Sequence, residues 1–256
     1  MADAPTLNAH AIDVAFDGVH AVSGVDLTLN KGETLGLIGP NGAGKTTLVN
    51  ALTGFQRLTG GRVELDNVDV TGWSPARLAN AGLVRTFQGV RVFPRLTAFE
   101  NVEVGALKHV KSRSDARRRA AEGLAVMGLD QFSSVRAEAL PHGTQRRLAM
   151  ARAFAAAPKY LLLDEPAAGL SEGESDALVR TIRWFHDSSD AGVLIIEHDM
   201  RVIMGICDRL HVLDFGKTLT VGPPEQVRSD AEVITAYFGG AHTDDESQMG
   251  SAHADR

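Results

Sequence analysis

A short glycine-rich segment between Gly39 and Thr47 carries the strongest chemical signal in this sequence. It reads Gly-Pro-Asn-Gly-Ala-Gly-Lys-Thr-Thr and matches the pattern G-x-x-x-x-G-K-[ST], which forms loops around phosphate groups. Its glycines allow backbone N–H groups to turn toward the phosphates of a nucleotide. Lys45 adds a positive charge for the β- and γ-phosphates, and the hydroxyl of Thr46 can bind Mg²⁺. The predicted nucleotide-binding residues of this loop are Asn41, Gly42, Ala43, Gly44, Lys45, Thr46 and Thr47.

A pair of acids after an apolar run is the second chemical signal. Leu161–Leu163 is typical of a buried strand, and Asp164 and Glu165 follow it directly. Hydrolysis of a nucleoside triphosphate needs a carboxylate beside Mg²⁺ and a group that orients the attacking water. Asp164 is suited to the first role through a water molecule, and Glu165 to the second as a general base. The alternative is a strand that ends in two solvated acids, and the phosphate-binding loop makes that alternative the weaker one.

The segments around the loop have sequences that can position it. Glu33–Ile38 is typical of a strand that enters the loop, and Thr46–Leu52 of a helix that leaves it. Such a helix directs the positive end of its dipole at the phosphates.

The composition excludes several other classes of protein. The chain has 256 residues, 44% of them hydrophobic, enough to build the core of one large domain or two small ones. No apolar run approaches the ~18 residues that span a bilayer, and the N-terminus lacks an apolar signal segment. The net charge of -6 argues against a nucleic-acid partner. We therefore expect a soluble cytosolic protein that reaches a membrane only through a partner.

The order of elements favours an α/β fold. Short strands are expected over 11–16, 25–29, 35–38 and 62–65, and Ala, Leu, Glu and Arg then dominate a helical insert from about Glu100 to Ala157. A strand, a helix over Glu172–Ser188 and a further strand over Gly192–Glu197 follow, so we predict a mostly parallel sheet covered on both faces.

Five further segments occur in a fixed order around the loop and the two acids. They are Ala15-Phe16-Asp17-Gly18, Arg85-Thr86-Phe87-Gln88, Leu140-Pro141-His142-Gly143-Thr144, Ala168-Gly169-Leu170-Ser171 and Ile195-Ile196-Glu197-His198-Asp199. In this order the motifs resemble the ATP-binding subunit of ABC transporters over about residues 7–240. The resemblance implies a P-loop NTPase (RecA-like) core with an antiparallel β subdomain and a helical subdomain. It also implies one domain over 1–240, with the helical subdomain inserted at about 89–157, and a disordered tail over 241–256.

The same resemblance implies roles for single residues. Phe16 would stack on adenine, His198 would contact the γ-phosphate, and Gly143 would face a nucleotide held by a second subunit. The catalytic set would be Glu165, His198 and Lys45; the Mg²⁺ set would be Thr46, Gln88 and Asp164. Gln88 would also bind the cofactor and sense a transmembrane partner. Taken alone, Phe16 fits a core position and His198 a structural one.

The segment Leu140–Thr144, called the signature loop below, departs from the family's usual L-S-G-G-Q. In the family this loop faces the nucleotide of a second subunit, and its serine donates to the γ-phosphate. Pro141 has neither a hydroxyl nor an N–H group to donate. Either the site completed by this loop is weakened within a heterodimer, or His142, Gly143 and the dipole of the following helix compensate.

Finer details resemble the branched-chain amino-acid importer (Liv-type) group. They include Asp164–Leu170, Glu197–Met200 and Gly222–Val227. The resemblance implies an ATPase that uses ATP and Mg²⁺ at the cytoplasmic face of the cell membrane. Its partners would be transmembrane permease subunits, a second ATPase subunit of the same or another kind and, indirectly, a periplasmic or extracellular solute-binding protein, with no nucleic acid. A non-transport soluble ABC ATPase and a low-turnover nucleotide-dependent regulatory subunit remain the alternatives.

Overall fold

The structure is a computed structural model that describes residues 6–107 and 110–238. The tail predicted over 241–256 lies outside these residues. The strands are β1 (Thr6–Phe16), β2 (Val19–Asn30), β3 (Thr34–Ile38), β4 (Gly60–Leu65), β5 (Val68–Asp69), β6 (Leu83–Arg85), β7 (Tyr160–Asp164), β8 (Gly192–Ile196), β9 (Arg209–Asp214) and β10 (Lys217–Gly222). The helices are α1 (Lys45–Leu52), α2 (Pro75–Ala81), α3 (Ala98–Ala106), α4 (Arg113–Val126), α5 (His142–Ala155), α6 (Glu172–Ser188), α7 (Met200–Ile206), α8 (Pro224–Arg228) and α9 (Ala231–Phe238), with single 3-10 turns η2 (Asp130–Phe132) and η3 (Ala137–Ala139).

A six-stranded sheet forms the centre of the fold, in the order β10-β9-β3-β8-β7-β6. All neighbouring pairs are parallel except β9 and the edge strand β10. Ile195 of β8 pairs with Gly36 of β3 on one side and with Leu163 of β7 on the other. The three strands therefore end side by side, and whatever follows them meets at one edge of the sheet.

Both faces of this sheet are buried, as the sequence predicted. Leu161 and Leu163 of β7 belong to a core shared with α3, α5 and α6. Leu162, between them, belongs to the core on the other face, with α1 and the strands β1 and β2. Successive side chains of a strand point to opposite faces, so three apolar residues in a row are what a doubly covered strand requires.

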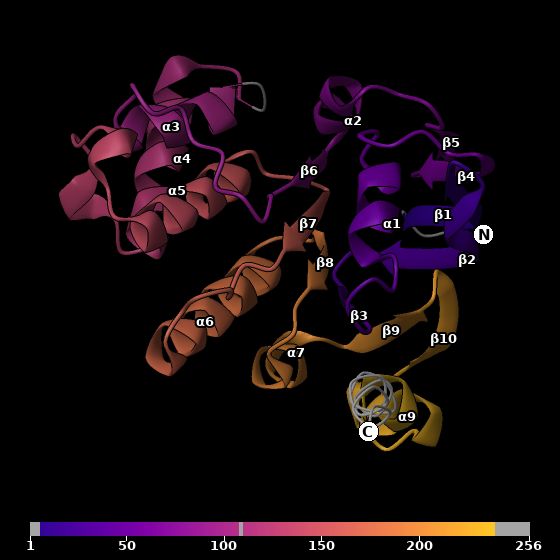
Figure 1. Cartoon of the computed structure of the whole chain (residues 1–256). Coiled ribbons are helices and arrows are strands. Elements are labelled where there is room, and N and C mark those ends of the chain that lie inside the picture. The colour runs from indigo at the N-terminus through magenta and orange to yellow at the C-terminus, as the bar shows by residue number, and fades with distance from the viewer. Residues whose placement is uncertain (1–5, 108–109, 239–256) are drawn as a thin grey trace, which may run out of the picture.

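Two smaller units flank the central sheet. The second sheet is antiparallel, in the order β2-β1-β4-β5. Helices α3, α4 and α5 gather into a separate cluster, which Figure 1 shows on the left, away from α1 and the antiparallel sheet. Small residues such as Ala98, Val102 and Ala120 are fully buried there and let the helices approach closely. The predicted fold class, an α/β core with an antiparallel and a helical subdomain, is confirmed.

Several elements were absent from the sequence prediction. Strand β1 begins at Thr6 rather than at residue 11, and α2, β6, β9 and β10 were not expected. Strand β9 starts with Arg209 and ends with Asp214, so its short apolar centre has no clear strand signal, and its burial comes from pairing with β3. Helix α2 had a local signal, a Ser74 N-cap followed by Pro75 at the first turn.

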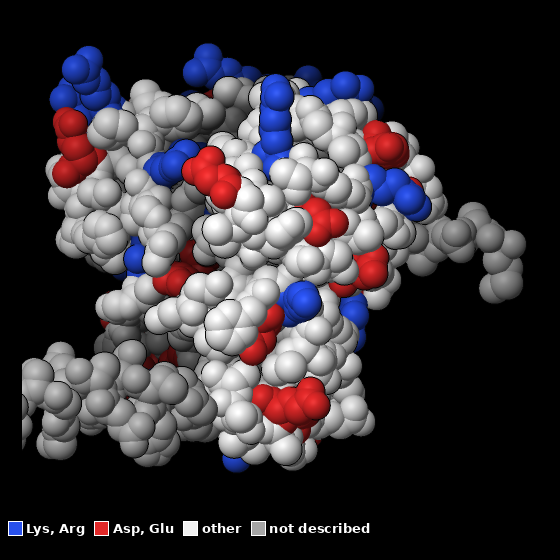
Figure 2. All heavy atoms as spheres, turned by 45° about the vertical axis from the view of Figure 1, so that its right-hand side comes forward, with Lys and Arg blue, Asp and Glu red and all other residues white. Residues whose placement is uncertain are grey.

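Charged side chains of both signs are mixed on the molecular surface. Figure 2 shows Lys and Arg interspersed with Asp and Glu across one face. This mixture agrees with a net charge of only -6 in 256 residues.

The buried His211 makes stability depend on pH. Burial, together with repulsion from Arg209, lowers the pKa of His211 from 6.5 to about 4. The unfolded chain therefore binds a proton between these two values that the native protein does not bind, so the free energy of unfolding falls as pH decreases through this window. We compare the free energy of unfolding at about pH 7.5 and at about pH 4.5. Its decrease between these values should be about 2–3 kcal/mol smaller for His211→Gln than for the unmodified protein.

Urea unfolding at a series of pH values measures this difference. The exposed His20, changed to Gln, is the matched control and should follow the unmodified protein. Parallel stability curves for His211→Gln and the unmodified protein would contradict the prediction.

Candidate functional site

The phosphate-binding loop lies between β3 and α1 and is enclosed by backbone from other strands. Gly44 has a φ of +99°, and a Cβ atom placed on it would lie 2.5 Å from the carbonyl oxygen of Ala21 in β2. Gly39, with a φ of +148°, faces the carbonyl of Leu213 in β9 in the same way. Glycine is required at both positions by the fold itself, before any nucleotide binds.

Lys45 lies inside this loop. Its Nζ donates to the carbonyl oxygens of Gly39 at 2.7 Å and Pro40 at 2.9 Å. Burial lowers the pKa of Lys45, and the negative charges of Glu165 and Asp164 act in the opposite direction. The structure thus brings the lysine of the loop and the two acids at the end of β7 into one electrostatic site.

Glu165 is the meeting point of three distant segments. Its Oε2 accepts a hydrogen bond from Nε2 of Gln88 at 2.7 Å, and its Oε1 lies 3.0 Å from Nε2 of His198. The φ of Glu165 is +47°, which is unusual for a residue other than glycine. This turn of the backbone ends the strand and directs the Glu165 carboxylate toward Gln88 and His198. Strain of this kind is concentrated at functional sites.

Asp164 is held by a residue that the sequence did not single out. Arg85, the last residue of β6, donates from Nη2 to Oδ2 of Asp164 at 2.7 Å. Both side chains are almost fully buried, at 5% and 4% exposure. No spacing rule in the sequence indicated this pair, because β6 and β7 are separated by the whole helical cluster.

Glu197 was also missed as part of the site. It accepts hydrogen bonds from the backbone N–H groups of Ala167 at 2.5 Å and His198 at 3.1 Å. Burial raises the pKa of Glu197, against the lowering effect of these hydrogen bonds. Glu197 therefore connects the loop that follows Glu165 to the end of β8.

Other predicted residues are accessible. Phe16, at the end of β1, is 47% exposed, and Thr46 at the start of α1 is exposed. The side chains of Asn41 and Gln88 are also exposed, so each can reach a bound molecule.

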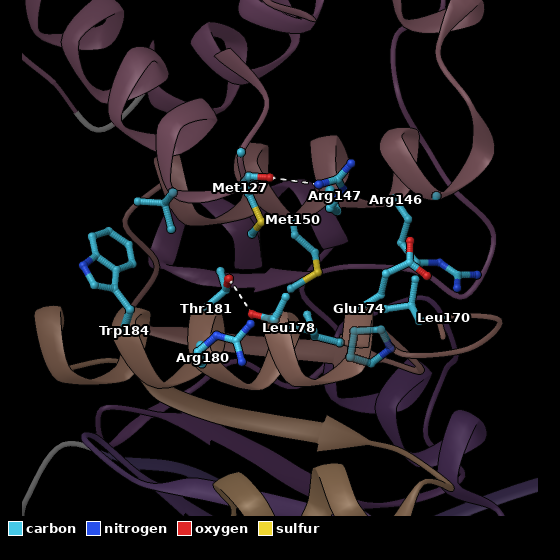
Figure 3. A pocket seen from close by; sticks show the side chains of 15 residues that line it. Met127, Arg146, Arg147, Met150, Leu170, Glu174, Leu178, Arg180, Thr181 and Trp184 are labelled. Atoms are coloured by element: carbon cyan, nitrogen blue, oxygen red, sulfur yellow. Dashed lines mark hydrogen bonds between the residues drawn. The ribbon is translucent and has the colours of Figure 1, made fainter. Parts of the chain in front are cut away.

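Gly143 lies away from the loop within this chain. It lines a cavity of about 560 Å³ between α5 and α6, which Figure 3 shows with Met150 and Arg147 above and Leu178 and Arg180 below. Figure 1 shows α5 in the helical cluster and α1 on the other side of β6 and β7. A contact of Gly143 with a nucleotide would therefore need a second chain.

A phosphate-binding loop and adjacent carboxylates at one edge of a doubly covered parallel sheet define a P-loop nucleoside triphosphatase. Comparisons with known proteins narrow this class. A family model described as ABC transporter matches residues 22–168, and one described as Branched-chain amino acid ATP-binding cassette transporter matches residues 217–243.

Similar proteins cover nearly the whole chain. The high-affinity branched-chain amino acid transport ATP-binding protein BraF of Pseudomonas aeruginosa is 40% identical over 252 residues, which cover 93% of this chain and 99% of that protein. A solved ATP-binding cassette of an ABC transporter in its ADP conformation is 29% identical with a TM-score of 0.81, covering 92% of this chain and 99% of that one. A dimeric cassette bound to ADP and Pi is 25% identical with a TM-score of 0.77, covering 85% and 98%.

The chain belongs to the ABC transporter family and is a nucleotide-binding ATPase of that family. The resemblance stated from the sequence motifs is thereby confirmed.

The loop geometry predicts a strong effect of one added methyl group. Gly44→Ala forces a side chain against the Ala21 carbonyl and into a strained φ, at a cost of about 1–3 kcal/mol. We expect the affinity for a fluorescent ATP analogue to fall about 5- to 150-fold, since each 1.4 kcal/mol of distortion corresponds to about a factor of ten. Gly173→Ala in α6, where a Cβ has open space, is the control and should bind normally. Normal binding by Gly44→Ala would show that the loop can relax.

Proposed function

We propose that this chain is the ATP-hydrolysing subunit of an importer for branched-chain amino acids or related small polar solutes. The observation that carries the proposal is the match of residues 217–243 to the model described as Branched-chain amino acid ATP-binding cassette transporter. The 40% identity to BraF over 93% of the chain supports the same assignment.

The proposed domain limits follow the sequence prediction. One ABC ATPase domain would span residues 1–240, with the helical subdomain over about 89–157. Its helices α3, α4 and α5, which pack on one another, support these limits.

The nucleotide would be ATP, held by the phosphate-binding loop with Phe16 against the adenine. Mg²⁺ would be held by Thr46, Gln88 and Asp164 together with phosphate oxygens. These side chains offer only oxygen ligands, which Mg²⁺ prefers. Within residues 6–107 and 110–238, no group of three or more His, Cys, Asp or Glu could hold a metal. When bound, Mg²⁺ neutralises charge that develops on the phosphates.

The hydrolytic step would use Glu165 as the base. A water molecule beside its carboxylate gives up a proton to Glu165 as its oxygen attacks the γ-phosphorus, and the bond to the β-phosphate oxygen breaks. Gln88 and His198 orient the carboxylate from two sides, at 2.7 and 3.0 Å. Lys45 would stabilise the negative charge of the phosphates. His198, next to the Glu165 carboxylate, would donate a hydrogen bond to the γ-phosphate when ATP is bound.

Replacement of the base separates binding from turnover. Glu165→Gln keeps the side-chain shape but cannot accept the proton, so we expect kcat to fall about 10²–10⁴-fold while ATP binding persists. A phosphate-release assay and a binding titration measure the two quantities. Glu172→Gln, at an exposed position of α6, should leave both unchanged. Turnover near that of the unmodified protein would show that another group is the base.

A second ATPase subunit would complete the site. The dimeric cassette described above supports this arrangement. Gly143 would then face the partner's nucleotide.

Pro141 is the N-cap of α5 and has no side-chain hydrogen bond to the helix. The N–H groups in the first turn of α5 therefore do not bond to the side chain of this residue. Compensation by the dipole of α5 and a weakened site within a heterodimer both remain compatible with this geometry. The ATPase rate of the chain alone, compared with that of the assembled complex, separates them. It also tests the low-turnover regulatory alternative.

The permease subunits would dock beside the segment that carries Gln88. A cavity of about 470 Å³ lies between α2, this segment and the helices α3 and α5. Phe87 and Phe93 provide apolar surface there, and Arg91 and Arg152 provide charge. A helical or extended segment of a membrane protein with apolar and acidic side chains fits this surface. Through this contact the chain would lie at the cytoplasmic face of the membrane. Among the described residues, none of the helices has the length and apolar character of a membrane span.

Purification from native membranes tests the transport assignment. A tagged Glu165→Gln protein, isolated from gently solubilised membranes with ATP present, is expected to retain two permeases and a second ATPase subunit. Recovery of the chain alone, or with ribosomal or DNA-repair proteins, would favour a soluble ABC ATPase instead.

A charge placed in the proposed docking groove should break this assembly. Val104 is 39% exposed and lines the cavity, so Val104→Arg is expected to lose the permeases while ATP binding is kept. Val68→Arg, at an exposed position of β5, is the matched control and should retain them. Mass spectrometry of the purified complexes gives the result. Equal recovery from both variants would place the docking surface elsewhere.

A further inference from the structure

Arg85 is buried where three elements of the site meet. Its Nη2 donates to Oδ2 of Asp164, the last residue of β7, at 2.7 Å. Its Nη1 donates to Oδ1 of Asn50 at 2.5 Å and to Oγ1 of Thr53 at 3.3 Å, at the end of α1. One planar guanidinium thus connects the carboxylate proposed for Mg²⁺ to the helix that follows the phosphate-binding loop.

The surroundings of Arg85 hold it in this orientation. Its guanidinium carbon lies 5.8 and 4.9 Å from the ring centres of Phe55 and Phe87, which pack edge to face on each other. Its Nε donates to the carbonyl oxygen of Thr86 at 3.2 Å. Contacts with two rings and four acceptors therefore stabilise this orientation of the guanidinium.

Only one oxygen of Asp164 is used by this pair. Among the described residues, no donor bonds to Oδ1, so that oxygen can accept from a water molecule on a metal ion. A carboxylate at the end of a strand can otherwise rotate about its side-chain bonds. Residues that hydrogen-bond to metal-binding carboxylates fix their orientation and commonly matter for metal affinity.

We propose that Arg85 is the positioning residue for the metal-binding carboxylate. It fixes Oδ2 of Asp164 and thereby aims Oδ1 at Mg²⁺, with Asn50 as the anchor on α1. This inference rests on the proposed role of Asp164 in the functional site.

The competing explanation predicts the opposite change in metal affinity when Arg85 is replaced. If Arg85 only neutralises Asp164 until a metal arrives, its positive charge opposes the metal, and its removal tightens metal binding. The contacts with Asn50, Thr53 and the two phenyl rings argue against such displacement. Metal affinity therefore distinguishes positioning from simple charge neutralisation.

The experiment compares ATP affinity with and without Mn²⁺ as the probe metal. All proteins carry Glu165→Gln so that ATP is not consumed. Arg85→Lys keeps the charge but replaces the planar fork, which bonds Asp164 and Asn50 through two separate nitrogens, by a single ammonium nitrogen. We expect the Mn²⁺ concentration needed for tight ATP binding to rise about 10- to 100-fold, with unchanged metal-free ATP affinity. Asn50→Ala keeps the ion pair and removes its anchor, so it should show a smaller rise in the same direction.

Arg209 offers a matched control. It pairs with Glu33 at the same distance, 2.7 Å, but at the start of the parallel strands, far from the phosphate-binding loop. Arg209→Lys is expected to lower the melting temperature and leave the Mn²⁺ dependence unchanged. An equal effect of the two arginine variants, or unchanged or tighter Mn²⁺ binding in Arg85→Lys, would overturn the inference. If Arg85→Lys does not fold, Asn50→Ala decides, and an unaltered Mn²⁺ dependence in that variant overturns it.

Asp164→Asn separates this inference from the proposed site. If Asp164→Asn binds Mn²⁺ and ATP normally, the metal role of Asp164 is wrong and the inference falls with it. If Asp164→Asn loses Mn²⁺ dependence and Arg85→Lys keeps it, only the positioning role is wrong.

Discussion

The register of three adjacent parallel strands brings the functional groups of this protein together. Ile195 in β8 pairs with Gly36 in β3 and Leu163 in β7, so the three strands end at the same edge. The phosphate-binding loop, the acid pair and His198 lie at these ends and therefore meet. Because both faces of the sheet are buried, a slip of one residue would turn every apolar side chain to the wrong core and separate the groups of the site.

The surroundings of Glu165 show how the meeting of these strand ends orients the proposed base. Its positive φ places the carboxylate between Gln88 and His198, and each of its oxygens has a partner among the described residues. Gln88 belongs to the segment that borders the proposed docking groove, so a single hydrogen bond separates that groove from the proposed base. A shift of this segment would change the orientation of the base directly, which is a physical route by which an attached membrane subunit can influence hydrolysis.

Local patterns predicted much of this architecture. Strands β3, β7 and β8 have mainly apolar sequences and are fully buried, and α6 has the bounds expected from its stripe of Leu178, Ile182 and Phe185. The elements that the sequence prediction missed are short or carry polar residues, such as β6 and β9. Their strand conformation is stabilised by ladder hydrogen bonds to β7 and β3, and a single segment contains no information about such neighbours.

The class of chemistry is evident from local sequence, because the phosphate-binding loop and the acid pair are each encoded in a few consecutive residues. The family is also evident from the sequence, because the order of its short motifs can be followed along the chain without knowing where the motifs lie in space. Three features are visible only in the folded protein. Arg85 pairs with Asp164, and Glu197 bonds to the loop after Glu165. Gly143 lies apart from Lys45, in the cavity between α5 and α6. These contacts join residues far apart in the chain, and they exist because packing and strand register bring their segments together, which no local spacing can express.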